Sequence, residues 1–148
     1  MDFILRQARR ADIPALWQVR YAVTENTLTP GKLCDEDVRR ESEDTGRGWV
    51  IEAVDATGQG GRIQAFAICN GLTGNVWALF VHPAAQGRGH GDALHRQMLR
   101  WLQSQPVPRL WLTTGAESRA CGFYERRGWM AVGAAGDSER RYERPNAG

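Results

Sequence analysis

Apolar and polar residues along the chain are patterned in a way that predicts seven strands with helices between them. The most uniform apolar run is Val76–Val81, which is typical of a strand buried on both faces of a sheet. Pro83 ends that strand, because proline has no N–H to donate to a neighbouring strand. The other expected strands span residues 3–7, 49–54, 62–69, 109–113, 129–133 and 139–144.

Helical patterns fill most of the remaining chain. Asp12 and Pro14 suit the start of a first helix that continues through Tyr21 and towards residue 26, with Trp17 and Tyr21 expected in the core. His95 is expected on an exposed face of the third helix. The other helices are expected over residues 35–43, 91–102 and 117–127, with Gly128 ending the last. Four apolar residues share one face of the third helix: Leu94, Met98, Trp101 and Leu102.

A glycine-rich loop separates the central strand from the third helix. Gly87, Gly89 and Gly91 allow the backbone to curl so that successive N–H groups point to one side. The helix that follows adds unpaired N–H groups and the positive end of its dipole, so the loop is expected to bind a phosphate or pyrophosphate. A P-loop does not fit, because Asp92 follows the last glycine and the only lysine is Lys32. A dinucleotide fingerprint does not fit the G-x-G-x-G spacing.

Two motifs together resemble the GNAT N-acetyltransferase superfamily. The first is Val81-x-Pro83 followed by Gln86-x-x-Gly89-x-Gly91, which is similar to the family's pyrophosphate-binding motif. The second runs from Ala120 through Phe123-Tyr124 to Gly128-Trp129 and is similar to A-x-x-F-Y-x-x-x-G-[FW]. Either motif alone is common, but the pair occurs in the family's order and at a usual separation.

The resemblance implies a single α+β domain over residues 1–148, with a mixed central sheet of about seven strands and helices on both faces. In the family the central strand is bulged and splays from its parallel neighbour, here residues 109–113. The order of the strands is taken from the resemblance.

The activity implied by the resemblance is transfer of an acetyl group from acetyl-CoA to an amine of a small molecule or a protein, by direct attack in a ternary complex. Tyr124 takes the position of the family's usual acid for the leaving thiolate. No metal is implied. The alternative is a non-catalytic CoA-binding sensor on the same fold. The implied CoA-binding residues are Leu79, Phe80, Val81, Gln86, Gly87, Arg88, Gly89, His90, Gly91, Asp92 and Tyr124.

The general base and the acceptor site are left open by the sequence. Glu117 stands where many relatives have an asparagine, and is either catalytic or the N-terminal carboxylate of its helix. Glu52 and Glu25 are further candidates for the base. The acceptor-binding candidates are Arg20, Glu25, Asn26 and Trp77.

The composition of the chain limits the classes of binding partner that we expect. The net charge is only +2, from 19 basic and 17 acidic residues, which does not favour nucleic acid or membrane binding. No apolar window is long enough for a membrane span, and no signal-peptide pattern is present. Cys34, Cys69 and Cys121 lack zinc spacing, which indicates reduced thiols in a cytoplasmic protein. The resemblance adds a homodimer through the C-terminal strands as an expectation.

Overall fold

The computed structural model describes residues 2–23, 33–57 and 59–146, and in them it has the seven predicted strands. They form two hydrogen-bonded sheets, ordered β1-β2-β3-β4 and β5-β7-β6, where one mixed sheet was expected. The strands are β1 (Asp2–Gln7), β2 (Gly46–Val54), β3 (Gly60–Asn70), β4 (Val76–Val81), β5 (Arg109–Gly115), β6 (Met130–Ala134) and β7 (Glu139–Pro145). The α-helices are α1 (Ile13–Ala22), α2 (Asp35–Arg39), α3 (His90–Leu102) and α4 (Arg119–Glu125). Short helical turns span Arg10–Asp12 (η1), Arg40–Asp44 (η2) and Pro83–Ala85 (η3).

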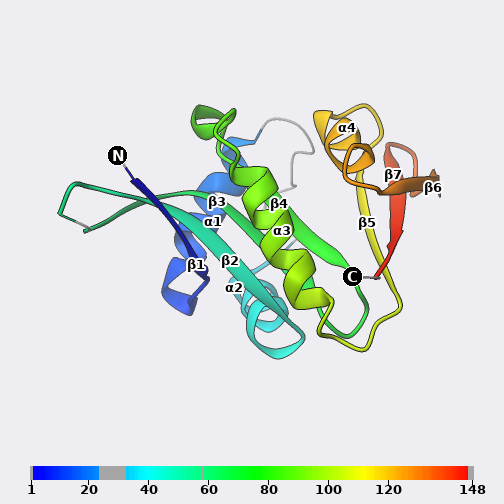
Figure 1. Cartoon of the computed structure of the whole chain (residues 1–148), viewed down its shortest axis with the longest axis horizontal. Helices are drawn as coiled ribbons and strands as arrows, with labels where there is room; N and C mark the ends of the chain where they lie inside the picture. Colours follow the sequence, from blue (N-terminus) through cyan, green and yellow to red (C-terminus); the bar gives the residue numbers. More distant parts are fainter. Residues whose placement is uncertain (1, 24–32, 58, 147–148) are drawn as a thin grey trace.

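The two sheets meet where β4 and β5 begin to run side by side. Asn75 forms a parallel bridge with Trp111, whose N–H donates to the Gly74 carbonyl at 3.0 Å. The Asn75 side chain donates to the Trp111 carbonyl at 3.3 Å. Past this junction the two strands belong to separate sheets, and Figure 1 shows β5 diverging from β4. The predicted parallel pairing and splay of residues 109–113 are thus confirmed.

A bulge in β4 decides which side chains face which side of the sheet. Cys69 pairs with Val76 and Ile68 pairs with Ala78, so Trp77 is the extra residue. Trp77 and Ala78 therefore both pack towards α1, whereas Val76 packs towards α3. The expectation that this strand is buried on both faces holds only at its beginning, because the split leaves its later residues partly exposed.

The core forms two layers on opposite faces of the four-stranded sheet. Ala65 and Ala67 of β3 pack against α3, and Phe66 between them packs against α1, as the two-residue period of a strand requires. In Figure 1, α3 crosses one face while α1 and α2 cover the other. The fully buried residues of α3 are Leu94, Met98 and Leu102, each contributing about 1.5–3 kcal/mol of burial free energy.

Several helical details differ from the sequence expectations. α1 ends at Ala22 in the described part, and its predicted continuation to residue 26 lies outside the described residues. Tyr21 is 49% exposed, because Val19 takes the buried position on α1. The Asp12 carboxylate accepts from the Arg9 N–H at 2.7 Å instead of capping α1.

Other expectations at the helix ends are met or refined. α4 is shorter than residues 117–127, and Gly128 follows it with φ +88°, the left-handed conformation expected for a helix-ending glycine.

Within the described residues, no helix combines the length and the apolar character needed to cross a membrane.

Candidate active site

The glycine loop is built for close approach of a ligand to its backbone. Gly87 and Gly89 both have φ +81°, a conformation that side chains rarely adopt, and a β-carbon at either position meets nothing within 4 Å. Gly89 is the N-cap of α3, whose unpaired N–H groups open into this space. Gly91 packs closely, because a β-carbon there would lie 3.2 Å from the Phe123 ring. The loop therefore has the geometry of an anion site.

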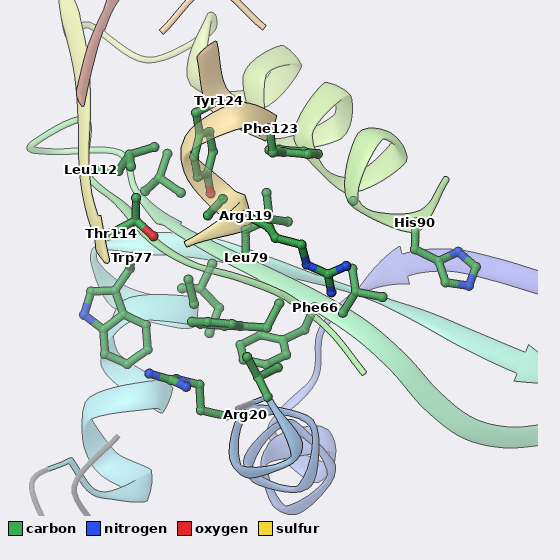
Figure 2. A pocket seen from close by; sticks show the side chains of 18 of the residues that line it. Arg20, Phe66, Trp77, Leu79, His90, Leu112, Thr114, Arg119, Phe123 and Tyr124 are labelled. Carbon is green, nitrogen blue, oxygen red and sulfur yellow. The ribbon is translucent and has the colours of Figure 1, made fainter. Parts of the chain in front are cut away.

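A cavity of about 700 Å³ extends from this loop along the split between β4 and β5 to α1. Figure 2 shows its walls, with Leu79 and Trp77 contributed by β4, Thr114 by β5 and Tyr124 by α4. The cavity brings together most of the predicted site residues: Arg20, Trp77, Leu79, Phe80, Val81, Gln86, Gly87, Gly89, His90, Gly91, Asp92 and Tyr124.

Tyr124 is held rigidly at the edge of the cavity. Its side chain is 6% exposed and packs edge-on against Phe123 and Trp129, with ring centroids 5.1 and 5.6 Å away. Figure 2 shows the ring pointing from α4 into the cavity with its oxygen leading. Burial raises the pKa of the Tyr124 phenol, so it stays protonated at neutral pH and can donate a hydrogen bond.

His95 stands behind Tyr124 and is buried, which corrects its expected exposure on α3. The Trp129 indole N–H donates to His95 Nε2 at 3.0 Å, and the His95 ring centroid lies 6.3 Å from that of Tyr124. Burial, aided by Arg144 and Arg127, lowers the pKa of His95 to about 4. The neutral ring forms part of the aromatic wall.

Arginines that the sequence did not single out line the phosphate-loop end of the cavity. The Arg119 guanidinium donates to Gln86 Oε1. Arg127 donates to Asp92 at 3.3 Å and to the Phe123 carbonyl at 2.9 Å. Arg126 also lines the cavity. The only sequence signal was the position of Arg126 and Arg127 inside the second motif.

Arg88, by contrast, does not contribute to the described cavity lining. Its side chain is exposed, and its guanidinium lies 5.6 Å from the centroid of the Phe3 ring on β1. The charge-assisted contact expected from Arg88 therefore stays a prediction.

Two acidic residues predicted as catalytic, Glu52 and Glu117, lie within the described residues, but neither lines the cavity. Glu52 is held by Arg6 at 3.1 Å, which also binds Asp12, so it belongs to an ion-pair network outside the lining. Glu117 is exposed in the turn before α4, whose N-cap is Ser118. The structure thus gives neither Glu52 nor Glu117 a place in the described lining, and their catalytic roles stay predictions.

Glu25 and Asn26 lie outside the described residues. The carboxylates that the described lining does contain are Asp92, held by Arg96 at 2.8 Å and by Arg127, and Glu139. Glu139 stands at the start of β7, opposite Gly115 of β5. Nothing local in the closing hairpin marks Glu139 as a site residue, so sequence reasoning missed it.

The end of the cavity near α1 is mostly apolar. Arg20 reaches into it and lies over Phe80, with the guanidinium carbon 4.3 Å from the ring centroid. Burial lowers the pKa of Arg20, but arginine remains charged at any physiological pH. Trp77 lines the same end because the bulge turns it towards α1.

The Acetyltransferase (GNAT) family is matched by residues 7–129 of the chain. The chain belongs to this family. A curated relative, a mycothiol acetyltransferase from Beutenbergia cavernae, is 33% identical over 106 residues. That alignment covers 69% of this chain but 36% of the relative, so the chain spans about a third of the relative's length.

Solved structures show the same fold over the whole chain. The ribosomal-protein-S18-alanine N-acetyltransferase of Escherichia coli has a TM-score of 0.75 at 18% identity, covering 99% of this chain and 96% of its own. A GNAT acetyltransferase of Staphylococcus aureus Mu50 has a TM-score of 0.78 at 14% identity, covering 99% and 100%. The PaiA N-acetyltransferase of Thermoplasma acidophilum, solved in complex with coenzyme A, has a TM-score of 0.72 at 15% identity, covering 98% and 99%.

Proposed function

We propose that this GNAT chain is an acetyl-CoA-dependent N-acetyltransferase that acts on a primary amine. One observation carries the proposal: the anion-binding loop at the start of α3 opens directly into the split between β4 and β5, and that split leads to Tyr124. One continuous cavity would thus hold a diphosphate and an extended thiol arm and bring the thioester to a proton donor.

The donor would bind through main-chain groups. The loop amides from Gly87 to Asp92 would hold the pyrophosphate of CoA, with Arg119 and Arg126 adding charge-assisted contacts. The pantetheine arm would lie against the edge of β4 that the split leaves open, as an added strand does. The N–H of Leu79 or Phe80 would then polarise the thioester carbonyl.

The chemistry requires one bond to form and one to break. The amine nitrogen attacks the thioester carbonyl carbon, the new C–N bond forms, and the C–S bond breaks with its electron pair moving to sulfur. The protonated Tyr124 phenol would supply a proton to that sulfur. Glu139 would take the proton that the amine loses, directly or through water, and release it to solvent, from which Tyr124 would be reprotonated. The products are an N-acetyl amide and CoA-SH.

The experiment is thiol release from acetyl-CoA by the purified full chain over a panel of primary amines, with CoA binding measured in parallel by calorimetry. The enzyme proposal expects CoA binding together with thiol release that depends on an amine. CoA binding without turnover on any amine would favour a CoA sensor. No heat with CoA at millimolar concentration would remove the loop assignment.

A further inference from the structure

Arginines lie at both ends of the cavity, but they come from different elements. At the phosphate-loop end, Arg119 donates to Gln86 and Arg127 donates to Asp92. Both arginines come from α4 and the turn after it, as does Arg126, which lines the same cavity. Arg20 comes from α1, on the opposite face of the four-stranded sheet from α3. Figure 2 shows the Arg20 guanidinium pointing towards Trp77, whereas Arg119 points towards the His90 side. Arg20 is therefore placed at the acceptor end.

The surroundings of Arg20 make its charge effective. Among the described residues, the side chains that line this end around Arg20 are aromatic or aliphatic, and the guanidinium lies over the Phe80 ring. A charge that is poorly solvated attracts an opposite charge more strongly than one in water. For the same reason it repels a second cation, so a polyamine or a lysine-like acceptor is disfavoured here. The residues that share this end are Leu16, Trp17, Val38, Phe66, Ile68 and Trp77.

The opposite wall offers a complementary charge. Glu139 of β7 lines the cavity and pairs with Gly115, the residue that follows Thr114 on β5. An acceptor with an anionic group at Arg20 would present its amine towards this wall, where the thioester would lie between β4 and β5. The described lining thus combines a cation from α1, apolar side chains and a carboxylate from β7.

Building on the acetyltransferase function proposed above, we propose that the acceptor is a small amino carboxylate with an apolar side chain, whose carboxylate is bound by Arg20. The planar guanidinium is suited to hold a carboxylate through two parallel hydrogen bonds. The aromatic and aliphatic lining takes the side chain.

The test uses acceptors that differ only in the carboxylate: L-phenylalanine, 2-phenylethylamine and L-phenylalaninamide. The amide is a necessary control, because its amine is the least basic of the three. More of that amine is deprotonated at neutral pH, so without a carboxylate effect the amide should react fastest. A hydrogen-bonded charge pair is expected to favour phenylalanine by about tenfold to hundredfold in kcat/KM over both analogues.

Two substitutions at Arg20 and one remote control assign the effect. Arg20→Met should lose most of the preference for phenylalanine, by about tenfold or more, while changing 2-phenylethylamine turnover and the CoA dissociation constant little. Arg20→Lys keeps a cation and should retain part of the preference. Arg62→Met, at an exposed position of β3 outside the described cavity lining, should behave as the unchanged protein.

The outcomes separate this inference from the function on which it rests. Amine acetylation without any preference for the carboxylate, or an equal loss on all three acceptors in Arg20→Met, would overturn the inference alone. Acetylation of protein or polyamine amines in preference to amino carboxylates would do the same. CoA binding with no acetylation of any amine would overturn the proposed function and this inference together.

Discussion

Tyr124 and Tyr142 are both buried tyrosines, but only Tyr124 faces the cavity. Tyr142 is fully buried on β7 and its hydroxyl donates to Glu125 at 2.6 Å, away from the cavity lining. The phenol of Tyr124 points at the split through which the thioester would enter. The pair therefore allows the hydroxyl proposed to be catalytic to be compared with one that lies away from the cavity.

Tyr124→Phe is expected to lower kcat by about 10²–10⁴-fold, the usual range for loss of a general acid, while the CoA dissociation constant changes little. Steady-state kinetics and calorimetry measure the two quantities. Tyr142→Phe serves as the control: it should cost stability but leave turnover per folded molecule unchanged. Equal losses in turnover and CoA affinity for Tyr124→Phe would make it a binding residue only.

The buried His95 side chain is expected to make the stability of the fold depend on pH. Its pKa is about 4 in the folded protein and 6.5 when unperturbed, so as the pH falls through this window only the unfolded chain takes up the proton. The free energy of unfolding should therefore decrease between pH 6.5 and pH 4, by on the order of 2–3 kcal/mol in total from this residue.

Urea unfolding at pH 7 and at pH 4.5 tests this prediction. His95→Gln should show a smaller loss of stability between the two pH values, because no imidazole is left to protonate. His82→Gln is the matched histidine control, since His82 caps η3 through a hydrogen bond from the Ala84 N–H at 3.0 Å and is not buried. A pH dependence in His95→Gln as steep as that of the unchanged protein would contradict the assignment.

At the scale of elements, the loop before α3 is where backbone conformation and charge act together. Gly89→Asp should weaken CoA binding by about a hundredfold or more, because a carboxylate would enter a site made of N–H groups at the positive end of a helix dipole. The CoA dissociation constant from calorimetry measures this.

Two controls separate charge from backbone strain in that experiment. Gly136→Asp places the same side chain at φ +85° in an exposed turn between β6 and β7, where a β-carbon also meets nothing within 4 Å. It should cost similar stability without changing CoA affinity. Gly89→Ala adds the strain without the charge and should have an intermediate effect. Unchanged CoA binding in Gly89→Asp would remove the loop from the donor site.

At the scale of the whole molecule, the division into two sheets creates the site. A continuous sheet would pair the later parts of β4 and β5 and leave no cavity. The junction at Asn75 and Trp111 holds the strands together at one end only, and the Trp77 bulge adds to the divergence. Cofactor and acceptor would then approach from opposite faces of the four-stranded sheet.

The outer edge of the three-stranded sheet gives the expected homodimer a testable surface. All five residues of β6 are exposed, including Met130 at 70% and Val132 at 50%. An exposed apolar edge strand is a ready partner for another strand. If this edge mediates a dimer, Val132→Lys should shift the protein towards a monomer in sedimentation velocity, whereas Leu72→Lys, at a residue 73% exposed in the β3–β4 turn, should not. Identical sedimentation of all three proteins would rule out this edge.

The sequence by itself determined the elements and the phosphate loop. Strands and helices follow from the spacing of apolar residues, and the left-handed backbone at Gly89 follows from glycine, so both are local properties of the chain. The paired motifs placed Tyr124 and the loop in one site, and the family match agrees with that resemblance.

Only the tertiary structure decided which charges face the cavity and how the sheet divides. Glu139 and Arg119 reach the site from elements distant in sequence, whereas Glu52 is drawn away by Arg6. His95 is buried because the segment after α4 folds Trp129 over it. These features depend on contacts between segments far apart in the chain. The spacing of apolar residues reports only local structure and does not predict such contacts.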